Sequence, residues 1–218
     1  MEKIRLLKII KDSIVAGILI GFGCITNVSC NNPVVGAFLF SLGLFAVIIQ
    51  GRYLFTGKVG YCGNEEITGK NYELVLGLFT NLISVWLLCF LFAKFSGLSI
   101  ECNELVSKKL NEGIVDALVK SIGCGAMMYI AVDGYSKTKN PITIIMPVMV
   151  FILCGFDHCI ANFGYMGLCG YFFIPIQLIC WVVGNSIGSW IISKVWLYFY
   201  RNICPLQNNV LPLQCQTK

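Results

Sequence analysis

The sequence has little charge: Lys, Arg, Asp and Glu together make up 12% of its 218 residues. A soluble domain needs roughly a quarter of its residues charged to cover its surface. Hydrophobic residues make up 57% of the chain instead, and the mean hydropathy is +0.78. These proportions exclude a soluble enzyme and predict a protein that lies in a membrane, in contact with lipid.

Candidate metal ligands are scarce as well. The chain has a single histidine, His158, and no two of its twelve cysteines have the Cys-x-x-Cys spacing of a zinc site. Most cysteines lie inside apolar runs, where a thiol behaves as a small apolar group. A membrane enzyme or redox protein that uses the cysteines and His158 is one alternative, but a zinc or haem site needs more ligands. We therefore predict no metal, no cofactor and no enzymatic activity.

Six apolar segments have about the length of 20 residues that a helix needs to cross the hydrocarbon core. The basic start of the chain resembles a signal peptide, but no cleavage site of small residues follows, so we expect a retained first helix. We predict one transmembrane channel domain over residues 1–204 and a short cytoplasmic tail at 205–218. The predicted spans are Ser13–Val28, Val34–Thr56, Tyr72–Phe95, Gly113–Val132, Pro141–Gly164 and Phe172–Tyr200.

The basic residues are distributed unevenly between the two sides of these six spans. Segments on the side of the N-terminus hold eleven Lys and Arg residues, and segments on the other side hold three. The positive-inside rule then places both termini in the cytoplasm, in a protein of the cell membrane. No basic stretch alternates with aromatic residues, so we expect no nucleic-acid partner.

The two halves of the chain share several features in the same order. Each has an Asn-Pro pair suited to start a helix, an apolar run that ends at a glycine, and an asparagine five residues before a tryptophan. Three helices per half put the halves in opposite orientations, which predicts an inverted 3+3 repeat with broken second and fifth helices. The paired residues are Asn32 and Asn140, Gly51 and Gly155, Asn81 and Asn185, and Trp86 and Trp190.

The ionisable pair Asp157 and His158 interrupts the fifth apolar segment. Ionisable groups at membrane depth are costly, and they are tolerated where broken backbone lines a cavity. The repeat places Thr56 at the position that His158 holds in the second half, so the two could form a polar spot in an apolar path. An inert histidine packed between helices is the alternative. Arg52 and Lys58 either add positive potential nearby or extend toward the cytoplasm.

Two stretches resemble the signatures of the formate/nitrite transporter family. They are FSLGLFAVIIQGRYLFTGKVGY (Phe40–Tyr61) and MPVMVFILCGFDHCIANF (Met146–Phe163), and the resemblance extends over nearly the whole chain. It implies an aquaporin-like, all-α membrane fold and a homopentamer with one pore in each subunit. It also implies a small monovalent anion as substrate, such as formate, nitrite, hydrosulfide, acetate or lactate.

The resemblance implies a role for each residue that matches the family pattern. His158 would be the central pore histidine and Thr56 its partner on the loop after the first part of helix two. Lys109, expected at the start of helix four, would contribute positive field. The remaining positions are Asp157 and Asn162 around the second break, Phe40 and Phe151 at an outer constriction with Leu44 one turn further along, and Leu54 at an inner constriction.

The chain departs from the family pattern at several positions. Tyr53 stands where the family has an acidic or amide residue, Arg52 where it has a small one, and Gly125 where helix four has an asparagine. A long N-terminal gating helix is expected to be absent. Asp116 and Lys120, spaced i, i+4 in the fourth span, are predicted to form an ion pair, either structural or within the pore.

These patterns favour a transport mechanism in which the anion becomes protonated. An anion that loses water in the vestibule becomes more basic. Protonation from His158, or through water, would give a neutral acid that crosses the apolar constrictions. The competing hypotheses are a neutral-solute channel of the aquaporin type and a structural membrane scaffold without transport.

Overall fold

The computed structural model describes residues 2–96 and 99–203, and all regular structure in these ranges is helical. Four helices are long and apolar enough to span a membrane, so the chain is a multi-pass membrane protein. They are α1 (Glu2–Val28), α5 (Asn71–Ser96, extended by α4, Glu65–Thr68), α7 (Ile114–Thr138) and α10 (Ile176–Ile203). The predicted tail at 205–218 lies outside the described residues.

The second and fifth predicted spans are each divided between two helices. The second comprises α2 (Pro33–Ile49) and the short α3 (Phe55–Lys58), followed by a 3-10 turn, η1 (Val59–Tyr61). The fifth comprises α8 (Ile142–Leu153) and α9 (Cys159–Leu168). One helix, α6 (Ser99–Leu110), was not predicted.

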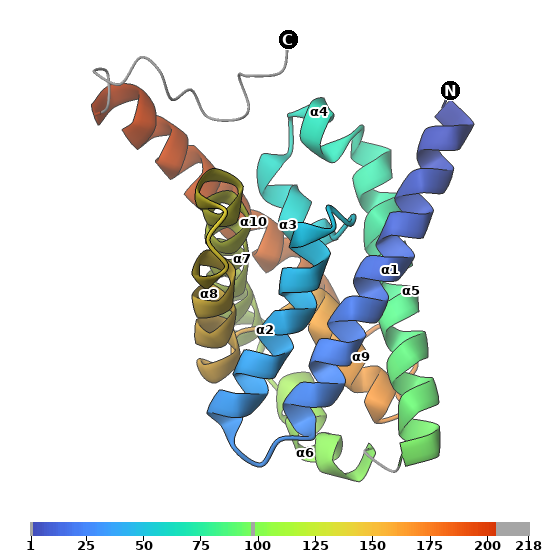
Figure 1. The fold of residues 1–218 in the computed structure, drawn as a ribbon. Coiled ribbons are helices and arrows are strands. Elements are labelled where there is room, and N and C mark those ends of the chain that lie inside the picture. Colours follow the sequence, from blue (N-terminus) through green and yellow to red (C-terminus); the bar gives the residue numbers. More distant parts are fainter. Residues whose placement is uncertain (1, 97–98, 204–218) are drawn as a thin grey trace.

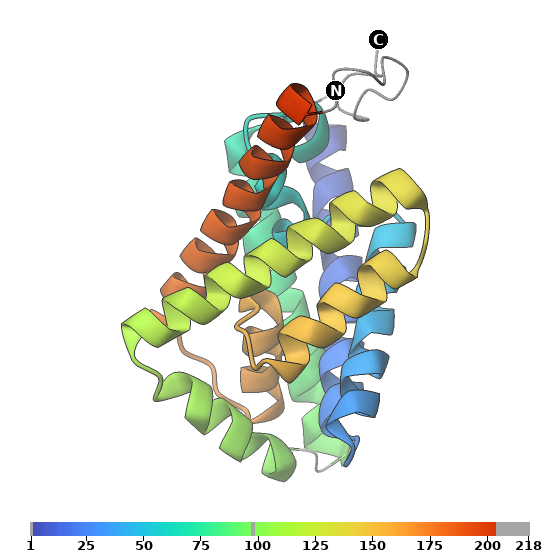
Figure 2. The same ribbon diagram turned by 90° about the vertical axis from the view of Figure 1, so that its left-hand side faces the viewer.

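The helices form a bundle whose two ends differ. α1 begins and α10 ends at the same end of the bundle, where α4 also lies (Figure 1). α6 and the connection between α1 and α2 lie at the opposite end (Figures 1 and 2). The two described ends of the chain therefore face the same side, as an even number of membrane crossings requires.

The apolar surface of the bundle continues to its outside. Phe79, Ile83 and Val119 are each more than half exposed, although they stand in the middle of long apolar helices. Exposure of so broad an apolar surface to water would be unfavourable for a monomer, whereas lipid or a neighbouring subunit would cover it. Polar groups gather in the interior instead, and there they are largely paired.

Small residues bring α7 and α10 into close contact. A Cβ atom added at Gly125 would lie 2.2 Å from the carbonyl oxygen of Asn185, and one at Gly188 would lie 2.0 Å from that of Ile122. Any side chain at these positions would push the two backbones apart. Close backbone packing thus explains why Gly125 stands where an asparagine was expected from the family pattern.

The two Asn-Pro pairs lie at helix starts. Asn32 Oδ1 accepts the N–H groups of Val34 and Val35 at 2.9 and 3.3 Å, so Asn32 is the N-cap of α2 as predicted. Asn140 Oδ1 accepts the N–H of Ile142 at 3.0 Å, but the cap position of α8 falls on Pro141, one residue later than predicted.

Candidate functional site

Two glycines follow the apolar helices α2 and α8. Gly51 follows α2 with φ 63°, and Gly155 follows α8 with φ 68°. This left-handed conformation is favourable for glycine and costly for other residues, which is why the chain can turn sharply here. Residues 50–54 link α2 to α3, and residues 154–158 link α8 to α9. The last residue of each link is extended and takes the N-cap position of the next helix: Leu54 before α3, without a side-chain cap, and His158 before α9.

An asparagine from α5 holds the first link. Asn81 Oδ1 accepts the N–H of Phe55 at 2.9 Å, and its Nδ2 donates to the carbonyls of Tyr53 at 3.0 Å and Ser13 at 2.9 Å. The amide is fully buried, and two of its three bonds, to Phe55 and Tyr53, satisfy backbone groups at the break, while the third joins the amide to α1.

An asparagine from α10 holds the second link in the same manner. Asn185 Oδ1 accepts the N–H of Cys159 at 2.9 Å, and its Nδ2 donates to the carbonyls of Asp157 at 2.7 Å and Ser121 at 2.9 Å. The sequence signal for Asn81 and Asn185 was their shared spacing to a tryptophan. That signal marked them as repeated features but did not identify them as residues of the site.

The structure brings His158 and Thr56 into contact, one from each link. His158 Nε2 lies 2.8 Å from Thr56 Oγ1, and both side chains are almost fully buried. The predicted polar spot is therefore present. The capping positions pair His158 with Leu54, however, so the expected repeat equivalence of Thr56 and His158 was wrong.

The hydrogen bonds of the imidazole determine where its proton lies. His158 Nδ1 accepts the backbone N–H of Ala161 at 3.0 Å, as the side-chain cap of α9. A nitrogen that accepts cannot carry a proton, so a neutral ring carries its proton on Nε2 and donates it to Thr56 Oγ1. The hydroxyl proton of Thr56 is then not used in this contact.

Two phenylalanines form the apolar surroundings of the histidine. Phe151 of α8 stacks on the His158 ring, with the ring centroids 5.8 Å apart and the planes at 14°. Phe40 of α2 meets Phe151 edge to face at 5.9 Å, and both phenylalanines are buried. The predicted constriction residues Phe40 and Phe151 thus touch each other directly beside His158.

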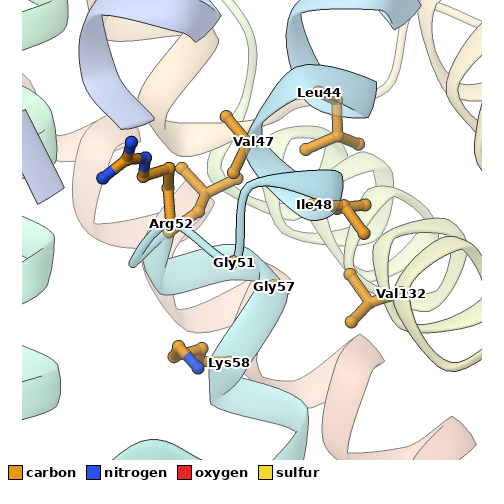
Figure 3. A pocket seen from close by; sticks show the side chains of 9 residues that line it. Leu44, Val47, Ile48, Gly51, Arg52, Gly57, Lys58 and Val132 are labelled. Carbon is orange, nitrogen blue, oxygen red and sulfur yellow. The ribbon is translucent and has the colours of Figure 1, made fainter. Parts of the chain in front are cut away.

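The other two predicted constriction residues line a cavity beside the first link. Leu44 and Leu54 are buried and face a space of about 120 Å³ together with Gly51 and Lys58 (Figure 3). Its walls come from α2, the link, α3 and Val132 of α7.

The two basic residues near the first link are both engaged. Arg52 donates to Asp12 Oδ1 at 2.8 Å and points toward α1 (Figure 3). Lys58 Nζ donates to the carbonyl of Ile67 at 3.0 Å and lies 5.2 Å from the centre of the Tyr53 ring. The charge of Arg52 is balanced by Asp12, which reduces its effect on the cavity.

Asp157 forms a buried polar cluster with two other predicted residues. Asp157 Oδ1 accepts from Lys109 Nζ at 2.6 Å and from Asn162 Nδ2 at 2.8 Å, and all three residues are buried. Lys109 lies in the last turn of α6 and not at the start of the fourth span, so that placement was wrong.

The predicted pair of Asp116 and Lys120 was also wrong. Lys120 Nζ binds Glu112 Oε1 at 2.5 Å, whereas Asp116 is exposed. Helical side chains lean toward the N-terminus of their helix, and this direction carries the ammonium group of Lys120 past Asp116 to Glu112, two residues before the start of α7.

Comparisons with known proteins identify the family of this chain. The sequence profile described as formate/nitrite transporter matches residues 2–200. The chain belongs to the formate/nitrite transporter family. Among solved structures it is similar to a pentameric formate channel with formate bound, with a TM-score of 0.73 and 22% identity over 92% of this chain and 99% of that one. It is also similar to an ion channel of the same family, with a TM-score of 0.74 and 20% identity over 89% of this chain and 90% of that one.

Curated members of the family align over part of their length. The formate channel FocA of Haemophilus influenzae is 28% identical over 66% of this chain and 54% of its own length. The uncharacterised transporter YrhG of Bacillus subtilis is 27% identical over 60% of this chain and 55% of its own length. The chain thus spans about half the length of these relatives.

Proposed function

We propose that the chain transports a small monovalent anion, or its conjugate weak acid, across the membrane through a pore in each subunit. Formate is the most favoured substrate, with nitrite and hydrosulfide as related candidates. The observation that supports the proposal is the buried contact of Thr56 with His158, two hydrogen-bonding groups beside the apolar ring of Phe151.

We infer an inverted 3+3 repeat with broken helices two and five as the framework of this pore. The register of the two breaks supports it, because the same residue spacing, 104 positions, separates Gly51 from Gly155 and Asn81 from Asn185. The same spacing also separates Leu54 and His158, which hold the N-cap positions of α3 and α9. Folds of this kind place the transported solute where the two halves meet.

The hydrogen-bond direction suggests how the solute is received. The Ala161 N–H is donated to His158, and a neutral His158 donates to Thr56. The Thr56 hydroxyl is left to donate to a solute, and each bond in such a chain strengthens the next. The histidine would thus act first as a polarising donor, and the proton that neutralises the anion would come through water.

Charged and apolar residues would act on the anion at different points of the transport path. A bare anion that gives up its water faces a cost of several kcal/mol or more, which Phe40, Phe151, Leu44 and Leu54 would impose. The positive charge of Lys109 would attract the anion before this barrier. Loss of water would raise the basicity of the anion, so that the neutral acid crosses the apolar surface.

The assembly and its orientation follow from the family and the charge pattern. We propose a homopentamer in the cell membrane, since a similar solved structure is described as a pentameric channel and the bundle exposes much apolar surface. The excess of basic residues at the end where α1 begins favours a cytoplasmic location for both termini.

Flux through the purified protein tests the proposal. Proteoliposomes that contain the protein should take up formate faster than protein-free liposomes, and nitrite, acetate and hydrosulfide should compete according to their size. The matched measurement is osmotic swelling in glycerol, which should equal that of protein-free liposomes. Swelling in glycerol without anion uptake would favour a neutral-solute channel, and an absence of both would favour a scaffold.

A further inference from the structure

A second cavity lies at the end of the bundle where α1 begins and α4 lies (Figure 1). This polar cavity has a volume of about 210 Å³, and its walls come from the first half of α1, the first link, α3, α4 and the start of α5. Gly51 and Lys58 line it, and they also line the space of about 120 Å³ beside Leu44 and Leu54, the leucine-lined cavity (Figure 3). The two cavities therefore share a boundary at the first link.

The boundary contains one glycine and one lysine. A Cβ atom added at Gly51 would meet no atom within 4 Å apart from its two chain neighbours, so the backbone borders open space there. Gly51 has no side chain of its own, and Lys58 is the boundary residue that carries one. A solute that moved from one cavity to the other would thus pass Lys58.

The acidic residues in the walls of the polar cavity are largely balanced. Asp12 accepts from Arg52 at 2.8 Å, and Glu73 accepts from Arg5 at 2.8 Å. The third acidic residue, Glu66, is exposed, and water weakens the effect of its charge. Little negative charge is left to repel an anion from this space.

The ammonium group of Lys58, by contrast, has no charged partner. In the part of the chain that the structure describes, neither Lys58 nor Lys8, the other lysine of the cavity wall, forms an ion pair. Lys58 Nζ donates to the carbonyl of Ile67 at 3.0 Å and lies 5.2 Å from the centre of the Tyr53 ring, and both of these partners are neutral. An ammonium group has three N–H donors, so its charge and further donors are available to a solute.

We propose that Lys58 binds a small monovalent anion at the boundary of the two cavities, as a site separate from the contact of Thr56 with His158. A hydrogen bond from an ammonium group to a carboxylate is about twice as strong as a neutral one. The polar cavity has room for water around the anion, whereas Leu44 and Leu54 lie beyond it. This role rests on the proposed transport function, from which formate is chosen as the probe.

Thermal denaturation of the purified full chain tests the site without any transport. Formate should raise the melting temperature of the wild type more than the same concentration of gluconate, a larger anion that serves as the salt control, because a ligand that binds the folded state stabilises it. Lys58→Gln keeps a donor for the carbonyl of Ile67 but has no charge, so it should lose most of this formate-specific increase. Equal increases in the wild type and in Lys58→Gln, or no increase in the wild type, would overturn the proposal.

Two further variants separate a local site from a general effect of charge. Lys70→Met removes an exposed ammonium group from the same end of the bundle, away from both cavity walls, and should keep the increase. Lys58→Arg retains the charge and should keep most of the increase. Loss of the increase in Lys70→Met would mean that the anion responds to the whole basic surface, which would contradict a site at Lys58.

Formate uptake by proteoliposomes gives the second readout. The formate concentration for half-maximal uptake should be about tenfold higher in Lys58→Gln than in the wild type, as expected for the loss of a hydrogen bond to a charged group, and unchanged in Lys70→Met. The same half-maximal concentration in the wild type and in Lys58→Gln would overturn the site and leave the transport function standing. Formate-specific stabilisation in a wild type without formate uptake would overturn the transport function and leave the site standing.

Discussion

Replacing Asp157 with alanine is expected to lower the free energy of unfolding by about 3 to 5 kcal/mol, the range for breaking a buried ion pair. Asp157 is fully buried, and its carboxylate binds Lys109 at 2.6 Å and Asn162 at 2.8 Å. Removing it leaves the buried Lys109 ammonium without its partner, and such a charge has no water to stabilise it. Denaturation of the purified variant in detergent measures the loss.

Two further variants show whether the lost charge balance is the cause. Asp116→Ala removes an exposed carboxylate near the same cluster and should change stability by no more than about 0.5 kcal/mol. The double variant Lys109→Met with Asp157→Asn removes both charges and should recover most of the stability. A double variant as unstable as Asp157→Ala would contradict this explanation.

Replacing His158 with phenylalanine is expected to reduce formate flux at neutral pH by at least about tenfold and to alter its dependence on pH. Phenylalanine preserves the stacking with Phe151 but removes both hydrogen bonds of the imidazole. Each buried group left without a partner costs about 1 to 3 kcal/mol, and the Thr56 hydroxyl loses the donor that orients it. The measurement is uptake by proteoliposomes across a series of pH values.

Matched substitutions separate transport from the capping of α9. His158→Asn supplies an efficient N-cap for Ala161, so the protein should stay folded, but the shorter side chain should not reach Thr56 and flux should remain low. Thr56→Ser keeps the hydroxyl group and should transport, whereas Thr56→Val should not. Unchanged flux and unchanged pH dependence in His158→Phe would remove this residue from the mechanism.

The sequence was sufficient to predict features that depend on local patterns. Apolar length identified the four long helices, although α1 begins at Glu2 and not at Ser13. Gly51 and Gly155, each followed by polar residues, located the two breaks. The contact of Thr56 with His158 was expected from the family pattern, and the structure contains it, although the repeat equivalence that also suggested it was wrong.

Features that depend on packing between distant segments were not predictable in this way. α6 carries many charged residues and has no apolar span, so nothing in its composition distinguished it from a loop. Lys120 was paired with Asp116 from helical spacing alone, because the fold that brings Glu112 beside it is not visible in the sequence. The roles of Asn81 and Asn185 required knowing which backbone groups the breaks leave unpaired.

The central claim is that one imidazole, protonated on Nε2, faces the path of the transported anion. Because His158 is the only histidine in the chain, nitrogen-15 labelling of histidine in a protein without a histidine tag gives an NMR spectrum of this ring alone. The account predicts an unprotonated Nδ1, a protonated Nε2, and a change of the Nε2 signal when formate is added. A ring protonated on Nδ1, or a spectrum indifferent to formate, would contradict it.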